Sequence, residues 1–287
     1  MSKTNSDSKC RSRKVRRSWF KTRRIKKKIQ YLFELIRYKG CLYTGKPYFG
    51  PVIAAAQAWK YRKPYMNKIV ELEVSKLKGE RYEILEIGSW AGDSAILWAN
   101  AIKKFNNGNG SVTCVDQWKP YIDLGKRDKA SPVISRMEKA LVKERIFNLF
   151  LHNIATSKLN DIIRPYKGSS DEVLITLRDN RFNLAFVDGS HAYSHVIRDL
   201  ENCRRLLCDG GILCGDDLEL QKHEVDVKVA EENKDIEDCI QDPKTGEYFH
   251  PGVTLAVGEF FGGEVSCFEG FWAARKTNSG WQRVNLA

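Results

Sequence analysis

The 287-residue sequence lacks the features that mark several common protein classes. No stretch approaches the roughly 18–20 apolar residues that a helix needs to span a bilayer. The basic N-terminus has neither a continuous apolar region nor a small-residue cleavage site, so it does not read as a secretory signal. There is no internal repeat. We therefore expect a globular cytoplasmic protein, with a peripheral membrane location left open by the basic N-terminus.

Cysteine is present, but not in a pattern typical of disulfides or metal sites. None of the eight cysteines forms a Cys-x-x-Cys pair, and several lie in apolar, strand-like runs. This placement favours reduced, buried thiols over a disulfide framework or a zinc site.

The dinucleotide pattern Gly-x-Gly-x-x-Gly is also missing from the stretch that organises the chain. Residues 83–95 read as a buried strand, a glycine turn and the start of a helix, with Gly88 and Gly92 bracketing the turn. Trp90 stands where a second glycine would let a pyrophosphate approach, so NAD fits poorly. A smaller zwitterion fits better, because its carboxylate can meet Ser94 or the helix N-terminus. Either Asp93 or Ser94 is expected to cap that helix.

A second strand, at residues 111–116, ends in Asp116, which lies 28 residues after Gly88. A carboxylate one strand-helix-strand unit after the glycine turn can accept both ribose hydroxyls of a nucleoside. Trp118 is positioned to pack on an adenine. The alternative is a strand-terminal aspartate that only caps a turn.

Three further carboxylates stand at the ends of two later predicted strands, at residues 183–188 and 212–217. These are Asp188, Asp216 and Asp217. The carboxyl ends of parallel strands meet at one edge of a sheet, and acids that converge there repel one another unless a cation joins them. Hard oxygen ligands suit Mg²⁺ or Mn²⁺.

These motifs together resemble class I S-adenosylmethionine-dependent methyltransferases. The run from Leu85 to Ala95 is similar to the first motif of the metal-dependent O-methyltransferases of the catechol type, and the later acids to those that act on macrolide sugars. The resemblance covers roughly residues 80–276. It implies an α/β, Rossmann-like sheet of seven strands with the last strand antiparallel, and an N-terminal helical extension.

The resemblance also implies roles for individual residues. Asp188, Asp216 and Asp217 would be the metal ligands, and His191 the base that takes the proton of an acceptor hydroxyl. A helix N-cap is the alternative for His191; a zinc-protease pair with His195 fails because Ala192 follows His191 where that motif has glutamate. The residues expected to bind S-adenosylmethionine are Glu86, Gly88, Ser89, Trp90, Gly92, Ser94, Asp116, Trp118, Ser169, Ser170 and Asp188. For Ser170, a plain N-cap is an equal explanation.

The implied function is Mg²⁺-dependent transfer of a methyl group to a hydroxyl of a sugar or small natural product. Three alternatives remain open. A metal-independent methyltransferase would use Asp216 and Asp217 only to shape the pocket. The second alternative is a Rossmann-like nucleotide or NAD binding protein, and the third is a catalytically inactive sheet domain tethered by its tail to an anionic surface.

Charge divides the chain into a basic tail and a balanced body. Residues 1–30 hold thirteen Lys/Arg and one acid, whereas residues 31–287 hold 48−13=35 basic and 36−1=35 acidic residues. We expect a disordered or amphipathic tail at 1–30, a helical cap at 31–79 and the methyltransferase domain at 80–287. A basic amphipathic helix can bind an anionic membrane or a nucleic-acid backbone; a solvated tail is the alternative. The sequence leaves a homo-oligomer open.

Overall fold

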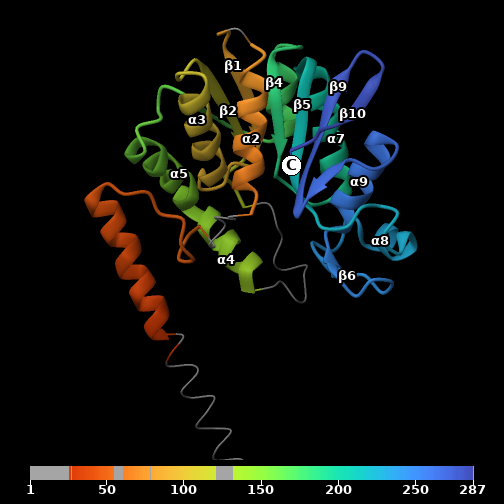
Figure 1. Cartoon of the computed structure of the whole chain (residues 1–287). Helices are drawn as coiled ribbons and strands as arrows, with labels where there is room; N and C mark the ends of the chain where they lie inside the picture. Colours follow the sequence, from red (N-terminus) through yellow and green to blue (C-terminus); the bar gives the residue numbers. More distant parts are fainter. Residues whose placement is uncertain (1–25, 27, 55–60, 78, 121–131, 287) are drawn as a thin grey trace, which may run out of the picture.

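The computed structural model describes residues 26, 28–54, 61–77, 79–120 and 132–286. Its centre is a mixed sheet in the order β10-β9-β5-β4-β1-β2-β3, with β8 also paired to β9 (Figure 1). The strands are β1 (Tyr82–Ile87), β2 (Gly110–Asp116), β3 (Ile163–Lys167), β4 (Phe182–Val187), β5 (Leu207–Leu218), β8 (Ser266–Phe268), β9 (Gly270–Thr277) and β10 (Gly280–Arg283). A separate ribbon joins β6 (Ile240–Gln241) to β7 (Tyr248–Phe249).

The α-helices that connect these strands are α2 (Lys63–Val74), α3 (Asp93–Phe105), α4 (Pro132–Leu141), α5 (Arg145–Thr156), α6 (Ser170–Val173), α7 (Tyr193–Leu206), α8 (Val227–Asn233) and α9 (Pro251–Phe261). Short 3-10 turns follow α4 and α6, at Val142–Glu144 and Leu174–Thr176. A further helix occupies residues 28–44.

The strand directions confirm the predicted Rossmann-like sheet, but among the described residues it has eight strands and not the predicted seven, because β8 and β10 both pair with β9. Strands β3, β2, β1, β4 and β5 are parallel neighbours. Strand β9 runs antiparallel to β5, and it forms the expected closing hairpin with β8 around Glu269. The short strands β8 and β10 share the outer edge of β9, where the Ser266 hydroxyl accepts a hydrogen bond from the Val284 amide at 2.8 Å.

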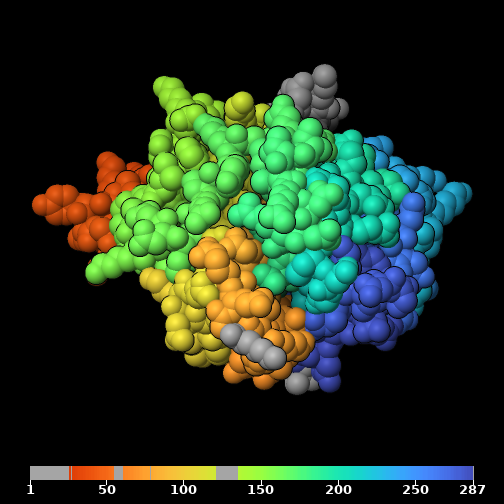
Figure 2. Space-filling model, turned by 90° about the horizontal axis from the view of Figure 1, so that it is seen from above, coloured from red at the N-terminus to blue at the C-terminus, as the bar shows by residue number. Residues whose placement is uncertain are grey.

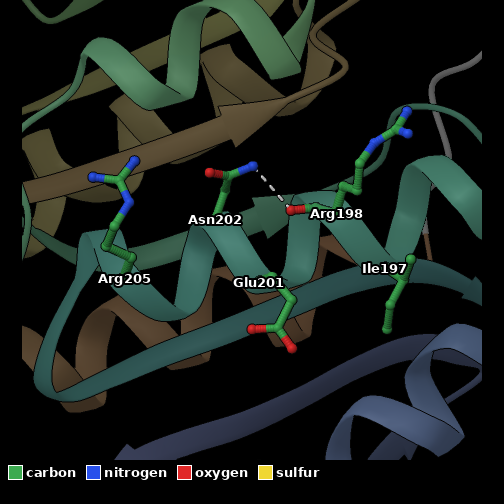
Figure 3. Close-up of a pocket in the computed structure, with 5 residues that line it drawn as sticks. All are labelled: Ile197, Arg198, Glu201, Asn202 and Arg205. Atoms are coloured by element: carbon green, nitrogen blue, oxygen red, sulfur yellow. Dashed lines mark hydrogen bonds between the residues drawn. The ribbon is translucent and has the colours of Figure 1, made fainter.

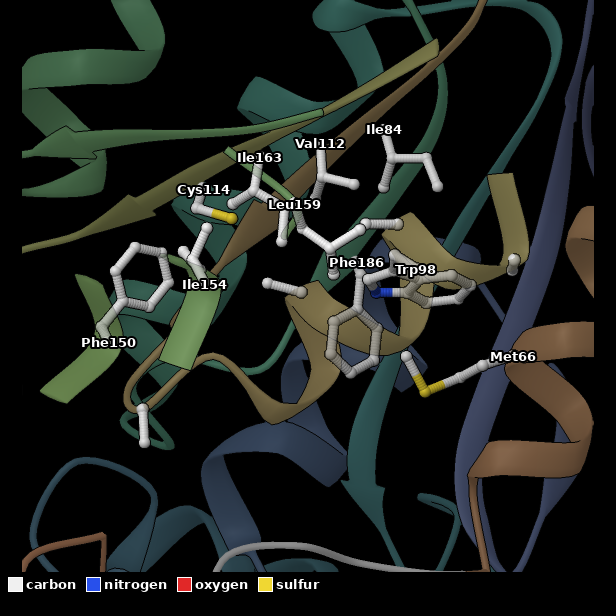
Figure 4. Close-up of a cluster of buried hydrophobic side chains, with 14 of the residues drawn as sticks. Met66, Ile84, Trp98, Val112, Cys114, Phe150, Ile154, Leu159, Ile163 and Phe186 are labelled. Atoms are coloured by element: carbon white, nitrogen blue, oxygen red, sulfur yellow. The ribbon is translucent and has the colours of Figure 1, made fainter. Parts of the chain in front are cut away.

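Alternation along the buried strands gives the sheet two hydrophobic faces. On β1, Ile84 joins a core with α2, α3 and α5, whereas Leu85 joins a second core with α7 and α9. Figure 4 shows the first core, in which Met66 and Trp98 lie near the ring of Phe186. Because both faces are covered, the sheet exposes its edges, and the carboxyl edge is left for a site.

The N-terminal part of the described chain covers one side of the sheet. From above, α2 (orange) lies between the α3 region (yellow) and the C-terminal strands (blue) (Figure 2). Tyr65 stacks on Phe268 at 5.0 Å between ring centroids, and Glu73 pairs with Arg275 at 2.6 Å. The helix at residues 28–44 extends away from the sheet (Figure 1).

Some predicted boundaries were wrong. The first helix continues past Gly40 to residue 44, because glycine weakens a helix without necessarily ending it. Strand β5 begins at Leu207, before the predicted start at residue 212, and has a register shift in its pairing with β4. Most of the expected disordered or amphipathic tail at residues 1–30 lies outside the described residues. Of the seven cysteines among the described residues, Cys114, Cys203 and Cys214 are buried, as predicted, whereas Cys239 is exposed.

Candidate active site

The glycine turn after β1 is built by a close approach between two strand ends. A side chain on Gly88 would place its Cβ 2.0 Å from the Asp188 carbonyl oxygen, and Gly88 has φ +85°. Gly92 also has φ +85° and is the N-cap of α3, so the predicted capping by Asp93 or Ser94 was wrong. A left-handed glycine leaves the first amides of α3 without a side-chain cap and open to a ligand.

Glu86, at the end of β1, is fully buried. One of its carboxylate oxygens accepts hydrogen bonds from Ser89 at 2.7 Å and from the Cys114 thiol at 3.3 Å. The other oxygen has no partner among the described residues. Burial raises the pKa of Glu86, and the Ser94 and Ser89 hydroxyls oppose that rise. A buried carboxylate with an unpartnered oxygen beside a glycine turn is suited to an ammonium group.

The carboxylate of Asp116 binds backbone amides of the turn. Its two oxygens accept hydrogen bonds from the amides of Trp90 at 2.9 Å and Trp118 at 2.8 Å. Each oxygen retains a second lone pair, so ribose binding stays a prediction. Trp118 itself is 1% exposed and packs on Phe147 and Phe150, so an adenine would need one of these rings to move.

The predicted serine loop has a capping role in this structure. Ser169, rather than Ser170, is the N-cap of α6 and forms a capping box with Glu172. Ser170 hydrogen-bonds the buried Asp199. Their contact with adenine stays a prediction.

The comparisons with known proteins concern this same region. A family model described as a methyltransferase domain matches residues 85–218, from the glycine turn through the two adjacent acids. Residues 85–218, slightly less than half of the chain, are therefore similar to a methyltransferase domain. Among curated proteins, no sequence matches the chain.

Three solved structures are similar to this chain, and one of them, NovP, shares its fold. The O-methyltransferase NovP is 15% identical, with 75% of this chain and 80% of that chain covered and a TM-score of 0.51. The calicheamicin methyltransferase CalS11 is 16% identical, with coverages of 74% and 77% and a TM-score of 0.49. Cofactor-bound Rv0187 from MTB is 15% identical, with 64% of this chain and 65% of that chain covered and a TM-score of 0.38.

Segment 48–54 lies over the glycine turn of the methyltransferase domain. The buried amide of Asn153 accepts from the Tyr48 amide at 2.8 Å and donates to the carbonyls of Tyr48 and Ala91, each at 3.0 Å. The Trp90 indole donates to the Ala54 carbonyl at 3.1 Å. These four hydrogen bonds hold the segment against the turn.

Two of the three strand-end carboxylates are joined by an arginine that precedes α2. Arg62 Nη1 lies 2.8 Å from Asp188 Oδ2 and 2.5 Å from Asp216 Oδ2. The Tyr61 hydroxyl donates to both oxygens of Asp216, at 3.0 and 3.1 Å. Burial raises the pKa of Asp188 and of Asp216, and Arg62 opposes both shifts.

The third carboxylate, Asp217, faces a different group. It has a left-handed backbone, with φ +64°, which is uncommon for a residue with a side chain. Its Oδ2 lies 3.0 Å from His191 Nε2, and Asp238 Oδ1 lies 2.9 Å from the other ring nitrogen, Nδ1. His191 therefore stands between two carboxylates.

The charges of His191, Asp217 and Asp238 shift one another's pKa values. Burial acts to lower the pKa of His191, but Asp217 and Asp238 outweigh it and raise that pKa well above 6.5. Burial acts to raise the pKa of Asp217, but the charge and hydrogen bond of His191 hold it well below its ordinary value. At neutral pH the free protein therefore carries an imidazolium between two carboxylates.

The donor set predicted for Mg²⁺ does not fit an ion in this arrangement. Asp188 and Asp216 already share Arg62, and Asp217 is paired with His191. Among the described residues, the ligand atoms that converge to within 4.8 Å belong instead to His191, Asp217 and His250. The assignment of Asp188, Asp216 and Asp217 as metal ligands stays a prediction that would require Arg62 to withdraw.

Other hollows lie away from these residues. One, of about 350 Å³, is on the outer face of α7, where the side chains of Ile197, Glu201 and Arg205 surround it (Figure 3). Arg205 is committed to the carbonyls of Leu174 and Leu177. A second, of about 530 Å³, lies between the end of β5 and α9. Neither includes a residue predicted for the site.

Sequence reasoning missed three side chains of the site. These are Arg62, Asp238 and His250. The Pro64 that follows Arg62 marks a helix start, but it does not single out the arginine. No local pattern identifies the last two, because loops bring them to His191 from 47 and 59 residues away.

Proposed function

We propose that this protein transfers the methyl group of S-adenosylmethionine to a hydroxyl of a sugar or small natural product. The observation that carries the proposal is the contact between the glycine turn and the Asp188 backbone, three residues before His191. A sulfonium cofactor on the glycine turn would therefore have its methyl group near a titratable imidazole. NovP and CalS11, by their names an O-methyltransferase and a calicheamicin methyltransferase, are in keeping with a hydroxyl on a natural product.

In this proposal His191 accepts the acceptor's proton. Asp238 holds the Nδ1–H and orients the ring, so Nε2 is the nitrogen that would take the proton, once the acceptor hydroxyl replaces Asp217 beside it. The acceptor oxygen forms a bond to the methyl carbon as the carbon–sulfur bond breaks, and neutral S-adenosylhomocysteine leaves. Only the neutral imidazole can do this, so the step requires the imidazolium of the free protein to lose its proton. No step is assigned to Mg²⁺, whose predicted ligands are engaged elsewhere.

A first experiment tests the cofactor. S-adenosylhomocysteine should raise the melting temperature of the full-length protein, and NAD should not. Stabilisation by NAD alone would favour the Rossmann-like nucleotide-binding alternative.

A second experiment tests the base. His191→Ala should lower kcat by about 10²–10⁴-fold and leave the affinity for S-adenosylhomocysteine nearly unchanged. His195→Ala is the matched control, since His195 lies four residues beyond His191 and its Nδ1 is hydrogen-bonded to the Ser190 hydroxyl at 2.9 Å. An equal loss of turnover and cofactor affinity would make His191 structural.

We also propose that the N-terminus binds an anionic membrane surface. The helix at residues 28–44 exposes large apolar side chains, including Tyr31, Leu32, Phe33 and Ile36, and follows a tail with thirteen basic residues. No helix among the described residues is long and apolar enough to cross a bilayer. Apolar side chains beside a basic tail suit the interfacial region of a membrane better than a nucleic-acid backbone.

The test is cosedimentation with vesicles that contain phosphatidylserine. Binding should fall with salt and on deletion of residues 1–30, and neutral vesicles should bind less. Equal binding to both kinds of vesicle, or tighter binding to RNA, would contradict the proposal.

A further inference from the structure

A buried guanidinium occupies the position between two strand-end carboxylates. The side chain of Arg62 is 6% exposed, and a single nitrogen, Nη1, lies within 2.8 Å of both Asp188 and Asp216. A charge as deeply buried as this is stable only when it is paired and hydrogen-bonded. Arg62 therefore belongs to the site and is not a surface cation that happens to lie nearby.

Neighbouring side chains also stabilise Arg62 and its partner Asp216. Its guanidinium carbon lies 5.6 Å from the centroid of the Phe186 ring, within the range of a cation–π contact. The Tyr61 hydroxyl occupies both oxygens of Asp216. Pro64, at the start of α2, fixes the backbone that delivers both side chains. Asp216 thus receives three hydrogen bonds from two consecutive residues.

We propose that Arg62 is the resident counter-cation of Asp188 and Asp216 and takes the place of a divalent ion between them. Arginine stays protonated over the working pH range, so this positive charge is permanent. Arg62 is a positioning residue. It fixes Asp188, whose backbone abuts the glycine turn, and Asp216, whose neighbour Asp217 faces His191. The inference rests on the proposed function only where turnover is measured.

Metal binding tests the inference without relying on activity. Full-length protein freed of metal by a chelator is titrated with Mn²⁺, and free Mn²⁺ is followed by electron paramagnetic resonance. Arg62→Ala leaves two carboxylates without their cation, so it should bind Mn²⁺ at least about tenfold more tightly than the wild type. Adding Asp188→Asn to Arg62→Ala should abolish the gain.

Arg275→Ala is the matched control. It also removes an arginine bound to a carboxylate, Glu73, but it lies where β9 pairs with the start of β5, away from the strand ends. It should show no gain in Mn²⁺ affinity. Arg62→Lys retains a positive charge and should resemble the wild type in Mn²⁺ binding, although a point charge bridges two carboxylates less well.

The inference is overturned if the wild type binds Mn²⁺ tightly and loses it on Asp188→Asn, a comparison that does not depend on Arg62→Ala being folded. It is also overturned if Arg62→Ala is folded and gains no affinity. Failure of the proposed function would appear separately, as an absence of S-adenosylhomocysteine binding by the wild type. Turnover that disappears with the chelator and returns with Mn²⁺ would leave the methyltransferase proposal intact and remove this one.

Discussion

His191 is held by a carboxylate on each ring nitrogen, and this single arrangement links catalysis to stability. Its pKa in the folded protein is raised above the ordinary 6.5 by Asp217 and Asp238. The stabilisation from this imidazolium is therefore complete below the unfolded pKa and is lost as pH rises through the folded pKa. Base catalysis needs the opposite protonation state, so turnover should increase over the same pH window in which this stabilisation declines.

Asp238→Asn tests this coupling. It removes one of the two negative charges beside His191, so the pKa of His191 should fall and the rise of kcat with pH should move to lower pH. The pH profile of kcat and the imidazole titration by NMR should shift together. A profile that keeps its position while the NMR titration moves would mean that another group is the base.

Asp199 offers a second test at a single residue. This carboxyl is 3% exposed on α7, and burial raises its pKa to about 7 from an ordinary 3.8. A carboxyl with a raised pKa costs stability as pH rises from the unfolded value to the folded one. Asp199→Asn should therefore increase the free energy of unfolding by about 1–2 kcal/mol at pH 8 and by little at pH 4.

Urea denaturation at both pH values provides the measurement. Asp209→Asn, at a side chain that is 73% exposed, is the control and should change stability little at either pH. A gain that is equal at pH 4 and pH 8 would show that ionisation of Asp199 is not the cause.

The candidate site was predicted only in part, because many of its contacts join residues that are far apart in the sequence. Strand-end residues such as Glu86, Asp188 and Asp217 can be predicted, because an apolar run stops at a polar side chain. Their ion pairs cannot be predicted in this way, because Arg62 and Asp188 are 126 residues apart in the sequence. The pattern of apolar and polar residues indicates which residue ends a strand. Which charged side chains pair with that residue depends on how the loops fold over the strand end.

At the scale of elements, the glycine turn combines two constraints that can be separated. Gly88 has a positive φ and also abuts the Asp188 carbonyl, whereas Gly108 has φ +78° and nothing within 4 Å of its Cβ position. Gly108→Ala should cost about 1–2 kcal/mol from the backbone alone. Gly88→Ala should cost more than that and weaken S-adenosylhomocysteine binding, because the ends of β1 and β4 must part.

Chemical denaturation and calorimetric titration with S-adenosylhomocysteine would make this comparison. Equal losses of stability in Gly88→Ala and Gly108→Ala would mean that the close approach to Asp188 carries no energetic weight.

Strands β1, β2 and β4 were predicted to within a residue or two, and the start of β5 and the helix ends less well. Strands β1 and β4 are mostly apolar and buried on both faces, a pattern with few alternatives. The start of α3 was mistaken because a left-handed Gly92 replaces a side-chain cap. The start of β5 was mistaken because Gly210 lies within a strand that has a register shift.

At the scale of the whole molecule, the net charge is confined to the first thirty residues of the sequence. Residues 1–30 carry the net charge, and the residues from 31 onward are balanced. Deletion of residues 1–30 should therefore leave the melting temperature and S-adenosylhomocysteine affinity unchanged within error while it lowers binding to anionic vesicles. A fall in melting temperature would show that the tail packs on the body.

The hydrogen bonds of Asn153 to Tyr48 and Ala91 should affect the rate at which S-adenosylhomocysteine is released. In the proposed cofactor site, a nucleoside that leaves beneath segment 48–54 requires the two hydrogen bonds between Asn153 and Tyr48, and the one between Trp90 and Ala54, to open. Asn153→Ala should accelerate release of S-adenosylhomocysteine in stopped-flow measurements. Residence time of the spent cofactor, rather than methyl transfer, would then limit the turnover of the intact enzyme.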